Sequence, residues 1–240
     1  MKERPILFSA PMARAILADT KTQTRRVANK TVRHPDLGNL YTPGALVTER
    51  EPQHVIERAC PYGQPGDRLW VRETFYAWGR WETRYSAKKG RDEWHFVDMT
   101  LECGKAYQYP ASGGQPQPQP MAGKRDGGVT PKWWKRPAIH MPRAASRITL
   151  EIVSVRVERL QDISEEDSRA EGVEWLDHAP ACPANNPAQG WRGYTNHEPL
   201  YRDTARESFI SLWQSINGTE SWAANPWVWV WVVEFKKRED

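Results

Sequence analysis

Apolar and polar residues alternate in three segments of the chain, which predicts three β-strands. These segments are residues 68–75, 146–157 and 226–235. In the last one, tryptophans occupy one face and valines the other, so this strand is expected to be buried on both sides. In residues 146–157 the alternation changes phase near Val153, which predicts a β-bulge. The apolar run at residues 6–8 predicts a further short strand.

Three segments show the spacing of amphipathic helices. The first begins near Pro11, which suits the first turn of a helix, and is not expected to run past Asp19 and Thr20, so that residues 21–26 enter a turn or a strand. The second opens with Ser164 as N-cap and Asp167 three residues later, a variant of the capping box, and ends at Gly172. The third covers residues 200–216, where apolar residues form one stripe.

The remaining residues show no sustained period. Residues 28–65 are expected to be loop-like, and residues 77–137 and 175–198 are expected to be insertions. Strands that outnumber helices predict an α+β, mainly β, fold: a mixed β-barrel with two or three flanking helices. A chain of 240 residues is compatible with a single domain over residues 1–240.

The longest apolar run has only seven residues, from Trp227 to Val233, so we expect no transmembrane helix. The N-terminus lacks the pattern of a signal peptide, and the three cysteines do not suggest a disulfide framework. We therefore expect a cytoplasmic protein. Glycine-rich phosphate loops and cysteine or histidine pairs with metal-ligand spacing are missing, so we expect no cofactor and no metal.

The net charge is only +4, but positive residues concentrate in residues 1–35 and 105–145. This segregation favours a phosphate-bearing ligand. Two solvated basic faces without any ligand are the alternative.

Several residues in and near these segments are candidates for binding. Glu73 stands among apolar residues of a strand, where it would contact a ligand or pair with an arginine such as Arg147. Trp133 and Trp134 adjoin cations, a combination that holds bases and phosphates, or else they anchor the insertion. Arg143 and Arg147 together could bind phosphate.

Six sequence segments resemble the ASCH family (activating signal cointegrator homology), and in particular long phage and prophage members. The matching segments are Lys2–Met12, Ile16–Arg26, Pro65–Phe75, His140–Arg147, Ile163–Gly172 and Asn225–Val230. They lie at both ends and in the middle of the chain and leave out both insertions.

The resemblance implies a PUA-like barrel and an RNA or nucleoside ligand. One ASCH branch hydrolyses the acetyl amide of N(4)-acetylcytidine with a Lys, a Thr and a Glu, which carry over to Lys21, Thr24 and Glu171. Asp19 stands where that branch has Gly. In such a site Lys21 would be the base, Thr24 the nucleophile and Glu171 the acid or orienting group, with Arg25 and Arg26 beside them.

We therefore expect a protein that binds a modified nucleoside or RNA and hydrolyses an acyl amide on it. The alternative for the residues themselves is a structural Lys21–Glu171 salt bridge with Thr24 in a turn. The alternative for the whole chain is a binding module without catalysis, and a metal-dependent ribonuclease ranks last. The sequence leaves the oligomeric state open.

Overall fold

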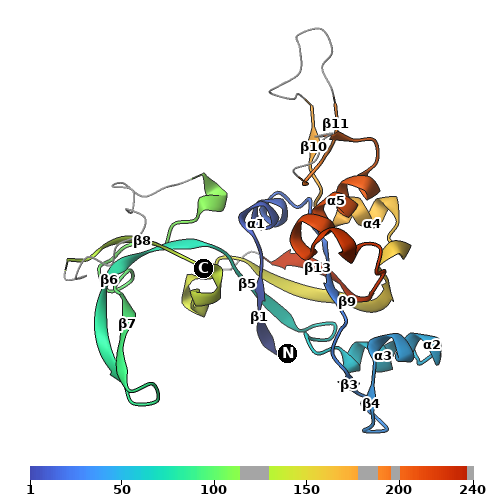
Figure 1. Ribbon diagram of the computed structural model, residues 1–240, viewed down its shortest axis with the longest axis horizontal. Helices are drawn as coiled ribbons and strands as arrows, with labels where there is room; N and C mark the ends of the chain where they lie inside the picture. The colour runs from blue at the N-terminus through green and yellow to red at the C-terminus, as the bar shows by residue number, and fades with distance from the viewer. Residues whose placement is uncertain (114–129, 178–188, 196–200, 237–240) are drawn as a thin grey trace. The chain divides into compact units, whose positions relative to one another are not determined.

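A computed structural model describes residues 1–113, 130–177, 189–195 and 201–236. The start of the helix expected at residues 200–216, and much of the insertion expected at residues 175–198, lie outside these ranges. The described residues form a mixed α+β fold in which strands hold more residues than helices (Figure 1). The predicted fold class, α+β and mainly β, is confirmed.

The chain comprises two compact units. Unit 1 holds residues 1–4, 15–69 and 148–240, and unit 2 holds residues 5–14 and 70–147. The insertion predicted at residues 77–137 therefore makes up most of unit 2. The single domain over residues 1–240 stays a prediction.

The largest sheet has five strands in the order β1-β5-β9-β13-β2. The boundary between the units falls within β1 and β5. β13 is antiparallel to both of its neighbours. β1 runs parallel to β5, because Arg68 N donates to Lys2 O and Phe8 N donates to Arg72 O. The bounds are β1 Glu3–Leu7, β2 Gln23–Val27, β5 Arg68–Arg72, β9 Thr149–Arg159 and β13 Trp227–Lys236.

The two long strands of this sheet agree with the alternation in the sequence. Trp229 and Trp231 on one face of β13 and Val228 and Val230 on the other are all buried. The register between β13 and β9 shifts at Val153, so the predicted bulge is confirmed.

The predicted closure into a barrel is not found. Within the described ranges the sheet is open, with β1 and β2 as its two edges. β2 has only five residues, and its pairing partner in the sheet is β13.

Residues 28–65, predicted to be a loop, instead contain two short helices and a two-stranded ribbon. Thr42 caps the first helix and Pro43 opens it. The second helix buries Val55 and Ile56, and Gln53 at its start donates to Val155 O of β9. The elements are α2 Pro43–Thr48, α3 Gln53–Ala59, β3 Val32–Arg33 and β4 Leu40–Tyr41.

The other helices are α1 Ala10–Leu17, α4 Glu165–Ala170 and α5 Ala205–Asn217. The first two lie where the sequence predicts them. The third starts later than predicted, because residues 201–202 form a strand and Thr204 caps the helix. Ser164 Oγ accepts from Asp167 N at 3.0 Å, which confirms the N-cap of α4. Glu165 joins α4 to α5 by accepting from Ala205 N at 2.8 Å and Arg206 N at 2.9 Å. Among the described helices, none has the length and apolar character needed to cross a bilayer.

A small antiparallel sheet follows α4 and adjoins α5, and five short 3-10 turns join other elements. The sheet consists of β10 Trp175–Leu176, β11 Gly190–Arg192 and β12 Tyr201–Arg202. The turns are η1 Pro110–Ser112, η2 Ala138–His140, η3 Arg143–Ala145, η4 Leu160–Asp162 and η5 Thr219–Ser221.

Unit 2 is built around a curved antiparallel sheet in the order β7-β6-β8 (Figure 1). Its strands are β6 Phe75–Ser86, β7 Arg91–Asp98 and β8 Lys132–Arg136. A small core of Phe75, Ala77, Met141 and Ala145 packs at the start of β6. The predicted insertion thus contains most of a three-stranded sheet, and residues on both sides of it supply most of this core.

Candidate functional site

The segment between α1 and β2 is held against the C-terminal end of α4. Lys21 N donates to Ala15 O at 3.1 Å, in the last turns of α1, and Thr22 N donates to Ala170 O at 2.9 Å. Lys21 and Glu171 form an isolated β-bridge. This backbone pairing brings the side chains of two residues that are 150 positions apart to the same place.

Lys21 and Glu171 form a buried ion pair. Lys21 Nζ donates to Glu171 Oε2 and to the Glu171 backbone oxygen, both at 2.8 Å. Their side chains are 3% and 5% exposed. Gly172 allows this approach, because a Cβ there would lie 2.8 Å from Lys21 Cβ.

Arg25 contacts the other oxygen of the same carboxylate. Its Nη1 donates to Glu171 Oε1 at 2.9 Å. Its Nη2 contacts Glu158 Oε1 at 2.7 Å and Asp167 Oδ2 at 2.8 Å, and its side chain is fully buried. The carboxylate of Glu171 therefore bridges Lys21 and Arg25.

Arg156 and Gln23 complete this network at its more exposed side. Arg156 contacts Glu158 Oε2 at 2.8 Å and Asp167 Oδ2 at 2.5 Å. Gln23 Nε2 donates to Asp167 Oδ1 at 2.6 Å. Three cations face three carboxylates, so the buried charges are compensated, as burial of charge requires. We call Lys21, Arg25, Arg156, Glu158, Asp167 and Glu171 the buried ion cluster.

The buried ion cluster changes the proton affinities of its members. Burial lowers the pKa of Lys21, although Glu171 opposes this effect, and the charges of Arg26 and Arg25 lower it further. Burial also disfavours the charge on Arg25, but Glu171 and Glu158 outweigh burial and raise its pKa. The side chain of Lys21 therefore loses its proton more readily than the side chain of a solvated lysine does.

Thr24 and Arg26 lie on the opposite face of β2 from Arg25, because side chains alternate along a strand. Thr24 is 1% exposed and sits opposite Trp231 of β13. Its Oγ1 accepts from Arg26 Nη1 at 3.2 Å. The alternative that placed Thr24 in a turn is wrong, since Thr24 is a strand residue.

The other predicted ligand residues belong to unit 2. Arg147 pairs with the buried Glu73 at 2.8 Å, which is the alternative that the sequence left open for Glu73. Arg147 also stacks on Tyr109, with 4.0 Å from Cζ to the ring centroid. Arg143 lies 5.9 Å from the ring of Trp70.

Trp133 and Trp134 are each only 8% exposed. Trp133 packs edge-on against Trp78, Trp134 packs against Trp81, and Trp134 Nε1 donates to Gly79 O. These rings anchor β8 to β6, which is the structural alternative given above. Their burial leaves little ring surface for a stacked base.

The structure thus brings Lys21, Arg25 and Glu171 together and places Thr24 with Arg26. Sequence reasoning missed Glu158 and Arg156 and treated Asp167 only as a helix cap. One signal was present: in residues 155–158 valines alternate with Arg156 and Glu158, which puts both charges on one face of a buried strand.

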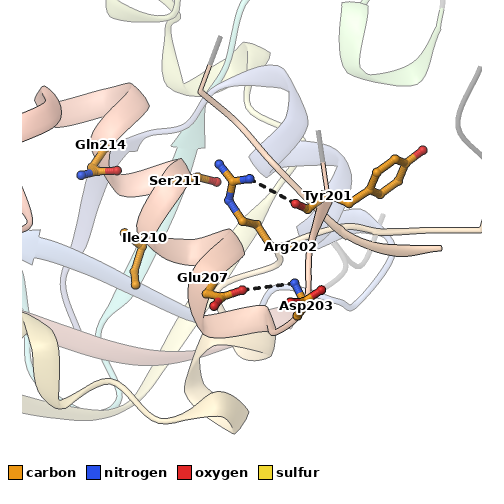
Figure 2. Close-up of a pocket in the computed structure, with 7 residues that line it drawn as sticks. All are labelled: Tyr201, Arg202, Asp203, Glu207, Ile210, Ser211 and Gln214. Atoms are coloured by element: carbon orange, nitrogen blue, oxygen red, sulfur yellow. Dashed lines mark hydrogen bonds between the residues drawn. The ribbon is translucent and has the colours of Figure 1, made fainter. Parts of the chain in front are cut away.

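A hollow of about 410 Å³ lies elsewhere in unit 1, between β12 and α5. Figure 2 shows Arg202 extending over α5 toward Ser211, while Glu207 accepts from Asp203 N at the start of the helix. The hollow is lined by none of the site residues predicted from the sequence.

Comparisons with protein-family models, with curated proteins and with solved structures found no match to this chain. Among the described residues, no group of three or more histidines, cysteines and acidic residues is arranged to hold a metal ion.

Proposed function

We propose that this protein is an amidohydrolase that removes an acyl group from the exocyclic nitrogen of a modified cytidine such as N(4)-acetylcytidine. The observation that carries the proposal is the Lys21–Glu171 pair: a buried amine with a lowered pKa, 2.8 Å from a carboxylate. An enzyme that must activate a hydroxyl near neutral pH needs a base of this kind.

The proposed family is ASCH, and the proposed fold detail is a PUA-like arrangement of the five-stranded sheet. The resemblance of the segments around Lys21, Thr24 and Glu171 supports this assignment. The mixed sheet with flanking helices is compatible with it.

In the proposed reaction, neutral Lys21 takes the proton of the Thr24 hydroxyl as Thr24 Oγ1 attacks the acyl carbonyl carbon. The tetrahedral intermediate then collapses, the carbon–nitrogen bond breaks, and the proton passes from Lys21 to the leaving amino group. Water hydrolyses the acyl-threonine ester and restores the hydroxyl. Glu171 orients Lys21, and Arg26, which donates to Thr24 Oγ1, stabilises negative charge near the reacting atoms.

A second candidate, a binding module without catalysis, has an observation in its favour. Both carboxylate oxygens of Glu171 are already engaged, one by Lys21 and one by Arg25. A carboxylate held in this way can be purely structural. In that case the protein would bind RNA or a modified base without turnover.

The test is to mix the purified protein with N(4)-acetylcytidine and follow its conversion to cytidine by chromatography. We expect turnover by the native chain, a loss of about a thousandfold or more in Thr24→Ala, and retained activity in Thr24→Ser. Thr22→Ala, two positions away in the same segment, is the matched control and should stay active. Binding without turnover would support the second candidate instead.

A further inference from the structure

Charge is distributed unequally between the two units. By sequence, unit 2 carries 15 lysines and arginines against 7 acidic residues, a net charge of +8, whereas unit 1 carries −4. Residues 130–147 of unit 2 contain five cations and no carboxylate. The acyl-nucleoside site proposed above lies in unit 1, so it does not account for this charge.

The sheet β7-β6-β8 has two chemically different faces, which follow from its register. Directly opposite residues share a face, and faces alternate along each strand. One face, here called the aromatic face, carries six aromatic rings from three strands. They are Phe75, Trp81, Tyr85, Trp94, Phe96 and Trp134.

The opposite face carries surface ion pairs. Arg84 contacts Glu82 at 2.7 Å, and Lys89 of the hairpin turn contacts Glu93 at 2.7 Å. We call this the ion-pair face. By register its strands hold two carboxylates, Glu82 and Glu93, and four cations, Arg80, Arg84, Arg91 and Lys135.

On the aromatic face the cations lie on rings. Arg136 Cζ lies 4.7 Å from the Trp81 centroid and 4.4 Å from that of Phe96, and Lys132 Nζ lies 4.7 Å from that of Trp134. The carboxylates of this face are Asp92 at the hairpin end and Asp98, which accepts from Tyr107 and Thr100.

Two of the six rings are open to solvent. Trp94 is 38% exposed and Tyr85 is 70% exposed. Tyr85 lies opposite Asp92, two positions from Trp94, so the two rings are diagonal neighbours, about 7–8 Å apart in such a pair. That spacing leaves room for one planar base on each ring.

We propose that the aromatic face of unit 2 binds single-stranded polynucleotide, with bases stacked on Trp94 and Tyr85 and phosphates held by Lys132 and Arg136. Exposed rings on a sheet face that also carries cations, in a positive unit, are the combination that retains unpaired bases and their backbone. A duplex hides the faces of its bases, so a single strand fits better. This inference does not rest on the proposed hydrolysis, and it concerns residues outside the segments that resemble ASCH proteins.

Fluorescence anisotropy of the full chain tests the proposal. The probes are fluorescein-labelled oligouridylate, oligothymidylate of equal length, a labelled duplex, and, in a parallel sedimentation assay, phosphatidylserine vesicles. We expect binding of the single strands over the duplex. The ratio of the affinities for the RNA and DNA probes then shows which kind of single strand the face prefers.

The variants come in pairs. In each pair, one residue lies on the aromatic face and the other lies on the ion-pair face of the same strand. We expect Trp94→Ala to weaken binding about fivefold to a hundredfold, and His95→Ala, its neighbour on the ion-pair face, to leave binding within about twofold. Lys132→Gln should lower the slope of log affinity against log salt by about 0.7. Lys135→Gln, on the same strand but the other face, should change it less.

Three results would overturn the proposal. One is an equal loss of affinity in Trp94→Ala and His95→Ala. Another is no binding of either single strand at low salt, and a third is capture by the vesicles with neither oligonucleotide bound, which would indicate a membrane surface instead. Circular dichroism of each variant ensures that lost binding is not lost folding.

Discussion

At the scale of the residue, the decisive feature is that Glu171 is shared by two buried cations. Its Oε2 accepts from Lys21 and its Oε1 from Arg25. Desolvation of charged groups is costly, and here it is offset only while every partner is present. Burial of the pair also lowers the pKa of Lys21, against the opposing effect of Glu171.

Replacement of Glu171 by glutamine should destabilise the protein strongly. The change leaves Lys21 and Arg25 buried without the anion that they share, a loss of about 3–5 kcal/mol in buried pairs. Urea unfolding should show a clearly lowered midpoint. Glu174→Gln is the matched control, because its pair with Arg192 is about half exposed and such pairs contribute about 0–1 kcal/mol. Equal midpoints for the two variants would contradict the structural account.

The loss of folding stability at acid pH should depend on Asp167. Burial opposes its charge, but Gln23, Arg156 and Arg25 outweigh burial and hold its pKa below the usual value. Its contribution is therefore complete above about pH 3.9 and is lost as the pH falls through the folded-state pKa. Asp167→Asn should be less stable at neutral pH and should lose less stability on acidification. Urea midpoints between pH 6 and pH 2.5 measure this, and an unchanged acid slope in the variant would count against it.

At the scale of the element, the sequence predicted what a regular pattern encodes. The alternation in β9 and β13, the bulge at Val153 and the cap at Ser164 follow from period and local chemistry. α2 and α3 escaped prediction because six or seven residues are too few to show a helical period. The hairpin β6–β7 also escaped prediction, although Trp81 and Tyr85 of β6 and Trp94 and Phe96 of β7 share one face.

The site was predictable only in part. The resemblance placed Lys21 and Glu171 together, and the structure has them in contact. The contacts of Arg25 with Glu158 and Asp167 depend on how β2, β9 and α4 are placed side by side. Pairings across more than 130 residues leave no local signal in one sequence.

The end of α4 should be sensitive to a side chain at position 172. Gly172 has φ +80°, and a Cβ there would lie 2.8 Å from Lys21 Cβ and 3.0 Å from Ala15 Cβ. Gly90 also has a positive φ, +63°, but nothing lies within 4 Å of its Cβ position. Gly90→Ala should cost about 1–2 kcal/mol from backbone strain alone, and Gly172→Ala should cost more. Thermal unfolding of both variants separates steric conflict from strain, and equal losses would argue against tight packing at Lys21.

At the scale of the whole molecule, the charge and the candidate chemistry fall in different units. Unit 1 is net negative and holds the buried ion cluster, whereas unit 2 is strongly positive and carries the aromatic face. The total of +4 conceals this division. A protein that processes a modified base within a polynucleotide needs both a reactive site and a surface for the strand, and the two units supply one each in our proposals.

The central claim is that Lys21 works as a buried base, and the pH dependence of kcat/KM for N(4)-acetylcytidine tests it most directly. A base acts only when it is deprotonated, and burial lowers the pKa of Lys21. The rate should therefore rise with pH along a limb whose midpoint lies well below about 10.4, the value for a solvated lysine. A rate that is flat or falls as the pH rises, or a limb centred at or above that value, would contradict the account.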